Sequence, residues 1–250
     1  MYTPRFSIIT VCYNAAHTIG RTVESVAAQT CTDYEHLIID GKSIDNTLQV
    51  VDLCPGGERR IIISEPDSGI YDAMNKGLGK ARGEYLIFLN AGDKFHDANT
   101  LERINEAAAE SPGIIFGETI IVNDAGEYVG PRHLKAPRML DYKDFAQGMV
   151  VCHQAFVVLR HIAPLYDTYY RFSADYDWCI KCLQHSRQNV RIDGTLIDYL
   201  SEGVTTSNRK LSLEERYHIM CHYYGTFPTI LRHIGFALRY LRNRLGGHPS

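Results

Sequence analysis

The fold of this chain is indicated most clearly by the stretch Gly83-Glu84-Tyr85-Leu86-Ile87-Phe88-Leu89-Asn90-Ala91-Gly92-Asp93. Its apolar run from residue 85 to residue 89 does not alternate with polar residues, which is typical of a strand buried on both faces. Small or turn-forming residues follow the run, so the carboxylate of Asp93 stands just past the carboxyl end of the strand. In open α/β sheets, ligands bind at that edge. A tight turn is the other interpretation, because Asn, Gly and Asp are common turn residues.

The composition is that of an ordinary globular protein. The 250 residues are 45% hydrophobic and 22% charged, which allows one large domain or two small ones. The net charge of -3 argues against broad nucleic-acid binding. Seven cysteines without framework spacing, and no secretory signal, predict a reduced, cytoplasmic compartment. No apolar stretch approaches the roughly 20 residues of a membrane-spanning helix, so any membrane contact is expected to be peripheral, on the inner face.

Strand and helix patterns alternate before the buried strand. Runs rich in β-branched residues indicate the strands, and apolar residues at helical spacing indicate the helices. The strands are expected at 6–11, 35–39 and 60–64, and the helices at 14–29, 47–53 and 70–82. Asn14 is a plausible N-cap for the first helix. This alternation predicts a Rossmann-like α/β fold with a mostly parallel central sheet flanked by helices.

The second half of the chain is less regular. A turn signal at 123–126 predicts a hairpin after two short strands, and residues 130–147 are expected to form a loop. Short strands are predicted at 114–116, 119–122, 154–160 and 194–199, and helices at 99–110, 175–184 and 213–224.

Five segments, in this order, resemble the family 2 glycosyltransferases with the GT-A fold that act in bacterial polysaccharide assembly. They are 7–14, 39–47, 64–77, 83–93 and 174–178. Each motif alone is weak, but their common order is specific, and the resemblance covers roughly the first 205 residues. It implies a GT-A domain over residues 1–205, with a nucleotide-sugar-binding half at 1–130 and an acceptor half at 131–205. Residues 206–250 would form a C-terminal helical extension.

The resemblance implies an inverting transfer of a sugar from a nucleotide-diphosphate sugar, with a UDP-sugar favoured. The acceptor would be a hydroxyl of a glycan or of a lipid-linked oligosaccharide. Such a reaction needs charge neutralisation on the departing diphosphate, a base for the acceptor proton and a pocket for the nucleoside. Asp93 is suited to hold Mg²⁺ or Mn²⁺. The family commonly has aspartates where Asn90 and Gly92 stand, so this sequence keeps only the last carboxylate of the motif.

Further residues are assigned to the donor nucleotide by the resemblance. They are Thr10, Val11, Tyr13, Asn14, Asp40, Asp67, Asn75, Lys76, Asn90, Ala91 and Gly92. Structural roles remain open for several of them. Asp40 is also suited to an Asp-Gly turn, Tyr13 to half-buried packing, and Lys76 to a solvated helix surface.

Asp175 matches the general base of the family, which removes the proton of the acceptor hydroxyl. The alternative is a helix cap, and that role is favoured for Asp177. His153 resembles a histidine at the donor edge, although a hydrogen-bonded core histidine is an equal alternative. Trp178 is expected to pack in the core or to stack on a sugar ring near the acceptor.

The C-terminal segment has the pattern of a basic amphipathic helix. Its apolar residues share one helical face: Phe227, Ile230, Leu231, Ile234, Leu238, Leu241 and Leu245. Nearby arginines favour contact with an anionic membrane surface. The alternative is packing on its own domain or on a second subunit, as in a homodimer.

Two other functions remain open at this point. A nucleotidyltransferase or sugar-nucleotide hydrolase would also grip a nucleoside diphosphate. A non-catalytic sugar-nucleotide-binding scaffold subunit is favoured by the reduced metal motif.

Overall fold

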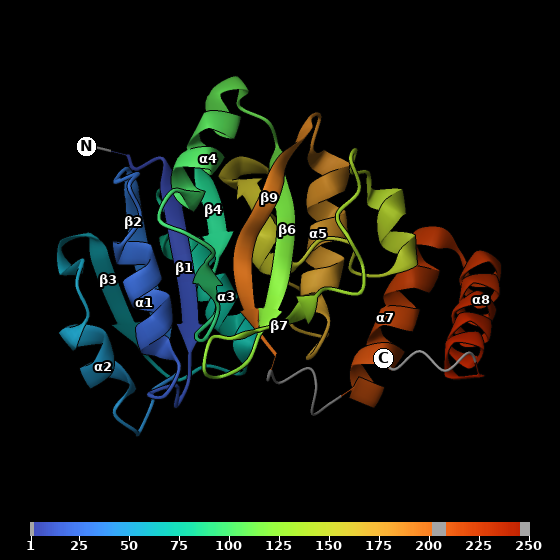
Figure 1. Cartoon of the computed structure of the whole chain (residues 1–250), viewed down its shortest axis with the longest axis horizontal. Coiled ribbons are helices and arrows are strands. Elements are labelled where there is room, and N and C mark those ends of the chain that lie inside the picture. The colour runs from blue at the N-terminus through green and yellow to red at the C-terminus, as the bar shows by residue number, and fades with distance from the viewer. Residues whose placement is uncertain (1–2, 202–208, 246–250) are drawn as a thin grey trace.

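The computed structural model of the chain describes residues 3–201 and 209–245. One curled central sheet runs through the molecule, with helices on both of its faces (Figure 1). The strand order is β3-β2-β1-β4-β8-β6-β9-β5, and β7 pairs with β6. The predicted α/β fold class is thereby confirmed.

The first half of the sheet is parallel. It contains β1 (Phe6–Cys12), β2 (Tyr34–Asp40), β3 (Arg60–Ser64) and β4 (Tyr85–Phe88), connected through α1 (Ile19–Ala27), α2 (Thr47–Leu53) and α3 (Ile70–Lys80). Cys12 pairs with Asp40, which pairs with Ser64. The strands therefore end at one level, and the loops that follow them meet at one edge of the sheet.

The first helix begins later than predicted. Asn14 has a positive φ of 48°, and α1 starts only at Ile19. The Asn14 backbone N–H donates to Ser43 Oγ (2.8 Å), and its side-chain oxygen accepts from the Ile44 N–H (2.9 Å). Asn14 is therefore part of a loop that is held by the loop after β2, and it is not the N-cap of α1.

The second half of the sheet is mixed. It contains β5 (Lys94–Phe95), β6 (Ile114–Val122), β7 (Tyr128–Pro131), β8 (Phe156–Leu159) and β9 (Asn189–Leu200). β8 is antiparallel to both β4 and β6, whereas β6 and β9 are parallel. The two short strands expected at 114–116 and 119–122 are one strand, β6. Its register shifts after Phe116, next to Gly117, where a Cβ atom would lie 2.6 Å from Leu196 Cδ1.

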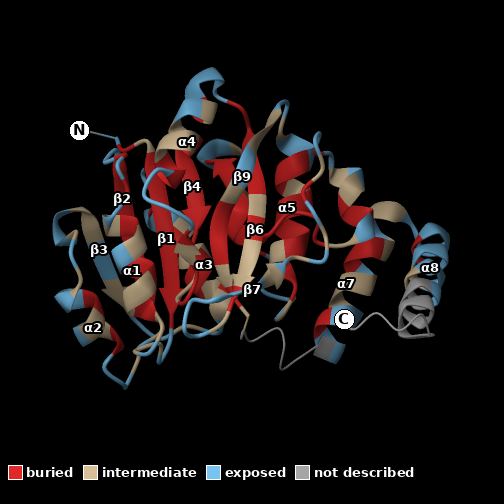
Figure 2. Ribbon diagram, viewed as in Figure 1, coloured by how far each residue is buried: buried red, intermediate tan, exposed pale blue. Residues whose placement is uncertain are grey.

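Two apolar layers hold the helices against the sheet (Figure 2). Successive residues of a strand point to opposite faces, so Ile8 and Ile9 of β1 join different layers. One layer includes α3 and α5 (Ala174–His185), and the other includes α1 and α4 (Thr100–Ala107). Short 3-10 segments lie at Gly57–Arg59, Ala108–Glu110, Tyr142–Gln147, His153–Ala155 and Arg160–Ile162.

The C-terminal helices are α7 (Arg209–Tyr224) and α8 (Thr226–Leu245). Ile219 and Met220 of α7 are buried in the same layer as α5. The predicted boundary between residues 205 and 206 lies outside the described residues, as do the side chains of Leu241 and Leu245. None of the helices in the described residues combines the length and apolarity that a bilayer crossing requires.

Candidate active site

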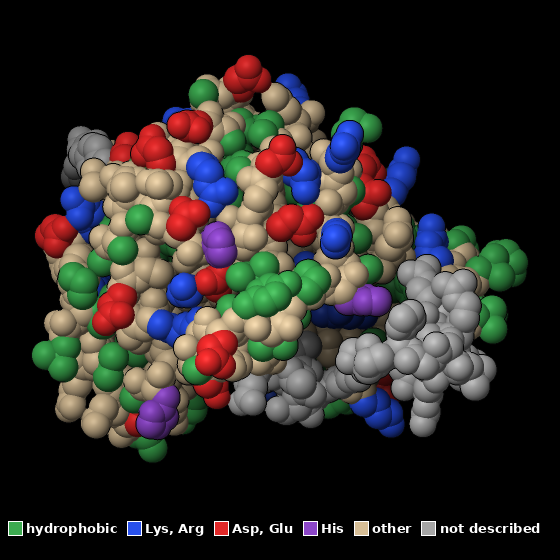
Figure 3. Space-filling view, viewed as in Figure 1, with side chains coloured by type: hydrophobic (Ala, Val, Ile, Leu, Met, Phe, Trp, Pro, Cys, Tyr) green, Lys and Arg blue, Asp and Glu red, His purple; other side chains and the backbone are tan. Residues whose placement is uncertain are grey.

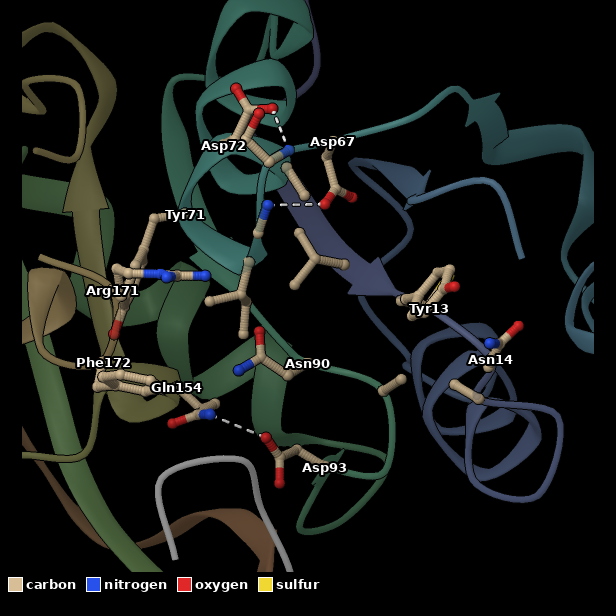
Figure 4. Close-up of a pocket in the computed structure, with 18 of the residues that line it drawn as sticks. Tyr13, Asn14, Asp67, Tyr71, Asp72, Asn90, Asp93, Gln154, Arg171 and Phe172 are labelled. Atoms are coloured by element: carbon tan, nitrogen blue, oxygen red, sulfur yellow. Dashed lines mark hydrogen bonds between the residues drawn. The ribbon is translucent and has the colours of Figure 1, made fainter. Parts of the chain in front are cut away.

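A cavity of about 650 Å³ opens at the carboxyl edge of β1 and β4. Tyr13 and Asn14 lie on one side of it, opposite Tyr71, Arg171 and Phe172 (Figure 4). Of the residues assigned to the donor and the metal, this first cavity is lined by Val11, Tyr13, Asn14, Asp67, Asn90, Ala91 and Asp93. These residues lie near the end of β1 or in the loops after β1, β3 and β4, so the loops after three parallel strands meet at this cavity.

Asp93 is buried at the base of the first cavity. Its Oδ1 accepts from the Leu200 N–H (2.9 Å), and its Oδ2 accepts from Gln154 Nε2 (2.9 Å). Burial raises the pKa of Asp93 to about 7. A cation or other positive group beside this carboxylate would favour its ionised form.

Asn90 lines the same cavity as Asp93. Its Oδ1 is buried and has no hydrogen-bond partner among the described residues. The described residues contain no cluster of three or more His, Cys, Asp or Glu side chains that could hold a metal ion. Asp93 and Asn90 nevertheless suit Mg²⁺ or Mn²⁺, because such ions take one or two protein oxygens together with substrate phosphates and water.

The backbone at Gly92 disfavours the carboxylate that the family commonly has there. Its φ is 102°, and a Cβ atom would lie 2.7 Å from Leu200 Cδ2. Its N–H donates to Thr22 Oγ1 (2.9 Å), and the Thr22 hydroxyl donates to the Asp93 carbonyl oxygen (2.7 Å). Gly92 therefore shapes the turn that presents Asp93, and it is not among the residues that line the cavity.

The opposite end of the cavity has an exposed aromatic ring and a carboxylate. Tyr13 is 61% exposed. Asp67 fills the space beside Gly41, where a Cβ atom would lie 2.4 Å from Asp67 Oδ2 and 3.4 Å from Tyr13 Cδ2. An aromatic face beside a hydrogen-bond acceptor is a suitable surface for a nucleobase.

Asp40 and Thr10 lie below the cavity and do not line it. The Asp40 carboxylate accepts hydrogen bonds from the Ser43 backbone N–H, the Ser43 hydroxyl and the Ser64 hydroxyl. Thr10 Oγ1 is 2.9 Å from His36 Nε2, and burial lowers the pKa of His36 to about 3. In this arrangement, both residues support the loops around the cavity.

Asn75 and Lys76 are also outside the lining of the cavity. The Asn75 amide exchanges two hydrogen bonds with the backbone of Tyr166, at 2.8 and 3.0 Å. Lys76 forms ion pairs with Glu65 (3.2 Å) and Asp72 (3.7 Å). The structure brings these two residues to the rim of the site, where they connect α3 to neighbouring loops.

Asp175 lines a second cavity of about 210 Å³ that adjoins the first. Both cavities are lined by Ile70, Tyr71, Asn90, Gln154 and Tyr199. The Tyr71 hydroxyl donates to Asp175 Oδ1 (3.0 Å), and burial together with Asp175 raises the pKa of Tyr71 well above its usual value. The cavity that contains Asp93 and the cavity that contains Asp175 therefore adjoin each other.

His153 lines the second cavity, whereas Trp178 lines neither. Burial lowers the pKa of His153 to about 4, so its ring is neutral at pH 7, and its Nε2 is 2.7 Å from the Tyr166 hydroxyl. Trp178 is fully buried, stacks on Tyr166 at 4.8 Å and donates to the Pro164 carbonyl oxygen. Its ring has no free face for a sugar. Trp178 therefore packs in the core, which is the first of the two roles expected from the sequence.

Several residues at the two cavities could not be assigned from the sequence. Gln154 and Tyr71 stand inside or beside recognised motifs and bind the two carboxylates. Arg132 and Arg216 line the second cavity from the segment after β7 and from α7. No sequence pattern relates these arginines to Asp175, because only the folded chain places them there.

Known proteins resemble this chain over most of its length. Residues 7–163 match the family described as Glycosyl transferase family 2. A PGL/p-HBAD biosynthesis glycosyltransferase of Mycobacterium tuberculosis is 35% identical over 193 residues, covering 74% of this chain and 72% of the relative. A putative teichuronic acid biosynthesis glycosyltransferase of Bacillus subtilis is 29% identical over 153 residues, covering 60% of each protein.

Solved structures share the fold at low sequence identity. TarS of S. aureus superimposes with a TM-score of 0.69 at 16% identity, covering 98% of this chain and 75% of that chain. GalNAc-T7, solved with UDP, GalNAc and Mn²⁺, superimposes with a TM-score of 0.63 at 17% identity, covering 80% of this chain and 44% of that chain. The family match, the relatives and the shared architecture agree with one another. The chain belongs to glycosyl transferase family 2 and is a glycosyltransferase with the GT-A fold.

Proposed function

We propose that this glycosyltransferase is an inverting enzyme of cell-surface polysaccharide biosynthesis. It moves a sugar from a nucleotide-diphosphate sugar, with a UDP-sugar favoured, to a hydroxyl of a glycan or lipid-linked oligosaccharide. The observation that carries this proposal is the placement of Asp93 and Asp175 in adjoining cavities with common walls.

The donor nucleotide binds in the first cavity. Tyr13, Asn14 and Asp67 surround its nucleoside, and the diphosphate lies toward Asn90 and Asp93. The size of the cavity and the exposed tyrosine ring support this orientation. TarS, which shares the fold, was solved in complex with UDP-GlcNAc.

The Asp93 carboxylate would hold a divalent cation, and the side-chain oxygen of Asn90, which lines the same cavity, could supplement it. When bound, Mg²⁺ or Mn²⁺ neutralises charge on the departing diphosphate. Burial raises the pKa of Asp93, and a bound cation would offset the cost of ionising this carboxylate. The Asn90 side-chain oxygen has no hydrogen-bond partner among the described residues, so it is free to accept a ligand. Gln154 and the Leu200 N–H orient the Asp93 carboxylate.

Asp175 is the general base. It accepts the proton of the acceptor hydroxyl while that oxygen attacks the anomeric carbon from the side opposite the diphosphate. A single displacement inverts the configuration at that carbon. Tyr71 fixes the carboxylate by donating to Oδ1, which leaves Oδ2 for the acceptor proton.

The test is the Asp175→Asn variant, whose amide oxygen is a poor proton acceptor. Sugar transfer is expected to fall by about 10²–10⁴-fold, while UDP affinity, measured by calorimetry with and without Mn²⁺, stays unchanged. Asp177→Asn is the control from the same helix, because Asp177 lines neither cavity. Its carboxylate instead pairs with Lys181 (2.6 Å) and accepts a hydrogen bond from the Tyr223 hydroxyl. Full transfer by Asp175→Asn would refute its role as base, and sugar release to water alone would indicate a hydrolase.

The enzyme is also proposed to associate peripherally with the inner face of the membrane through the C-terminal extension. Phe227, Ile230, Leu231, Ile234 and Leu238 of α8 are exposed. Residues 226–245 contain four arginines and no acidic residue. A helix with these properties suits an anionic lipid surface.

A further inference from the structure

The second cavity is basic on the side facing Asp175. Arg132 and Arg216 both line it, and Asp175 is the one carboxylate among its lining residues. The two arginines come from distant parts of the chain, so their convergence is a property of the folded protein.

Neither guanidinium has a carboxylate partner among the described residues. Arg132 Nη2 donates to the Met149 carbonyl oxygen (2.9 Å), and no ion pair is formed. Arg216 Nε is buried without a hydrogen-bond partner, and the guanidinium lies 5.9 Å from the centre of the Tyr176 ring. By contrast, Arg82 forms an ion pair with Glu35 (2.8 Å). A buried donor without a partner is costly, so Arg216 is suited to receive an anion from outside the chain. Arg132, which forms no ion pair among the described residues, lines the same cavity and can bind the same anion.

The first cavity has the opposite charge. Asp67, Asp72 and Asp93 line it, against Arg171 as the cation. The charge of the donor diphosphate would thus be neutralised by the cation proposed to bind in the first cavity. An anion bound by Arg132 and Arg216 would lie in the second cavity, beside Asp175.

We propose that the second cavity is an acceptor subsite that binds an anionic group of the acceptor through Arg132 and Arg216. The anionic group is a carboxylate of an acidic sugar or a phosphate, both of which match the planar fork of arginine. This inference rests on the proposed function, because Asp175 must face the acceptor. It adds that the enzyme selects a charged acceptor over a neutral one.

Methionine methyl groups report on this cavity directly. Met74 and Met149 line it, whereas Met139 is 87% exposed and lines neither cavity. The full chain, labelled with ¹³C at the methionine methyl groups, is titrated with methyl β-D-glucuronide, methyl β-D-glucoside or methyl phosphate. The glucuronide or methyl phosphate is expected to shift Met74 and Met149 but not Met139. The glucoside should bind at least tenfold more weakly, and the two anions together distinguish a carboxylate source from a phosphate source.

Variants test the arginines. Arg216→Gln and Arg132→Gln are each expected to weaken anion binding about tenfold, whereas Arg138→Gln, at an exposed position, should leave it unchanged. The buried Met220 methyl resonance checks that each variant is folded. The same titration is repeated with saturating UDP.

Three outcomes would overturn the proposal: no shift with either anion, equal binding of the glucoside, or displacement of the anion by UDP. Displacement would assign the arginines to the donor phosphates. A different result would count against the proposed function alone. In that case UDP would not bind, while the anion would still bind and would still depend on the two arginines.

Discussion

At the scale of single residues, two glycines determine where carboxylates stand around the first cavity. Gly41 leaves the space that the Asp67 carboxylate occupies, and Gly92 excludes a side chain next to Leu200. A carboxylate at residue 92 would need a strained positive φ and a shifted Leu200 side chain. The conformation of this turn therefore accounts for the glycine in the metal motif. Asn90 is the residue whose side-chain oxygen could supplement the Asp93 carboxylate as a metal ligand.

Replacement of Gly41 by alanine tests the role of Asp67. The added Cβ would lie 2.4 Å from Asp67 Oδ2, so the carboxylate must move away from its position in the cavity. We expect UDP affinity to fall about tenfold, the loss of roughly one hydrogen bond to a charged group. Gly79→Ala is the control on α3, since no atom lies within 4 Å of the place that its Cβ would take. Equal UDP binding by both variants would remove Asp67 from the nucleoside site.

His36 predicts an acid-dependent loss of stability. Burial, with the nearby charge of Arg60, lowers the pKa of His36 to about 3, compared with about 6.5 in the unfolded chain. Below pH 6.5 the unfolded state binds a proton that the folded state does not, so stability falls as the pH falls toward 3. At pH 5 the loss from this group amounts to about 2 kcal/mol.

Urea unfolding of His36→Gln and the unmodified protein at pH 7 and pH 5 measures this contribution. The glutamine can keep the hydrogen bond to Thr10 Oγ1, and it does not titrate. Its stability relative to the unmodified protein should rise by about 2 kcal/mol between the two pH values. Asp93 changes stability in the opposite direction, but it is present in both proteins. A pH-independent difference would contradict the assignment of a neutral buried His36.

At the scale of elements, α7 holds the segment that leads into α5. The Glu215 carboxylate accepts from the backbone N–H groups of Arg171 (2.8 Å) and Phe172 (2.9 Å). The Ser173 hydroxyl donates to the Ser212 carbonyl oxygen (3.1 Å). These contacts lie immediately before Asp175, so α7 positions the base as well as supplying Arg216.

The Glu215→Ala variant tests this positioning. Two hydrogen bonds to a carboxylate are lost, and we expect a loss of stability of about 1–3 kcal/mol. Hydrogen exchange at the amides of Arg171 and Phe172 should accelerate, and sugar transfer should fall more than UDP affinity. Glu214→Ala is the matched control, because Glu214 is exposed and forms a long ion pair with Lys210 (3.9 Å). Unchanged exchange at both amides would show that α7 does not anchor this segment.

At the scale of the whole molecule, charge and apolar surface are distributed unevenly. Acidic and basic side chains are interspersed over the face seen in Figure 3, in line with the net charge of -3. On α8, by contrast, exposed apolar residues accompany arginines without any acidic residue. A second copy of this helix would bring like charges together, whereas an anionic bilayer complements them.

Sedimentation with vesicles containing anionic lipid tests membrane association. The Ile230→Glu/Ile234→Glu variant is expected to bind at least tenfold less than the unmodified chain, because it places two carboxylates on the apolar face. Leu53→Glu, on the exposed surface of α2, is the control and should bind normally. Neutral vesicles should bind the unmodified chain weakly. A dimeric mass in light scattering that the α8 variant abolishes would instead indicate a second subunit as the partner.

The sequence by itself determined the alternation of strands and helices in the first half. The expected bounds of α2 and β3 agree with the structure, because these elements are specified by local periodicity and by Pro, Gly and Asp at their ends. The motifs also indicated the family and the two carboxylates, Asp93 and Asp175. The sequence predicts a helix cap at Asn14, and this prediction is wrong. Asn14 is held in its loop by hydrogen bonds to Ser43 and Ile44, which are distant in sequence.

Only the tertiary structure decided which side chains reach the cavities. The resemblance assigns both Asp40 and Asp67 to the donor nucleotide. In the structure, Asp40 accepts hydrogen bonds from Ser43 and Ser64, whereas Asp67 lines the first cavity. Arg132 and Arg216 line the cavity of Asp175 only in the folded chain, in which α7 joins the apolar layer that contains α5. The physical reason is that backbone periodicity is set by neighbouring residues, whereas burial and charge pairing are set by contacts between segments far apart in the chain.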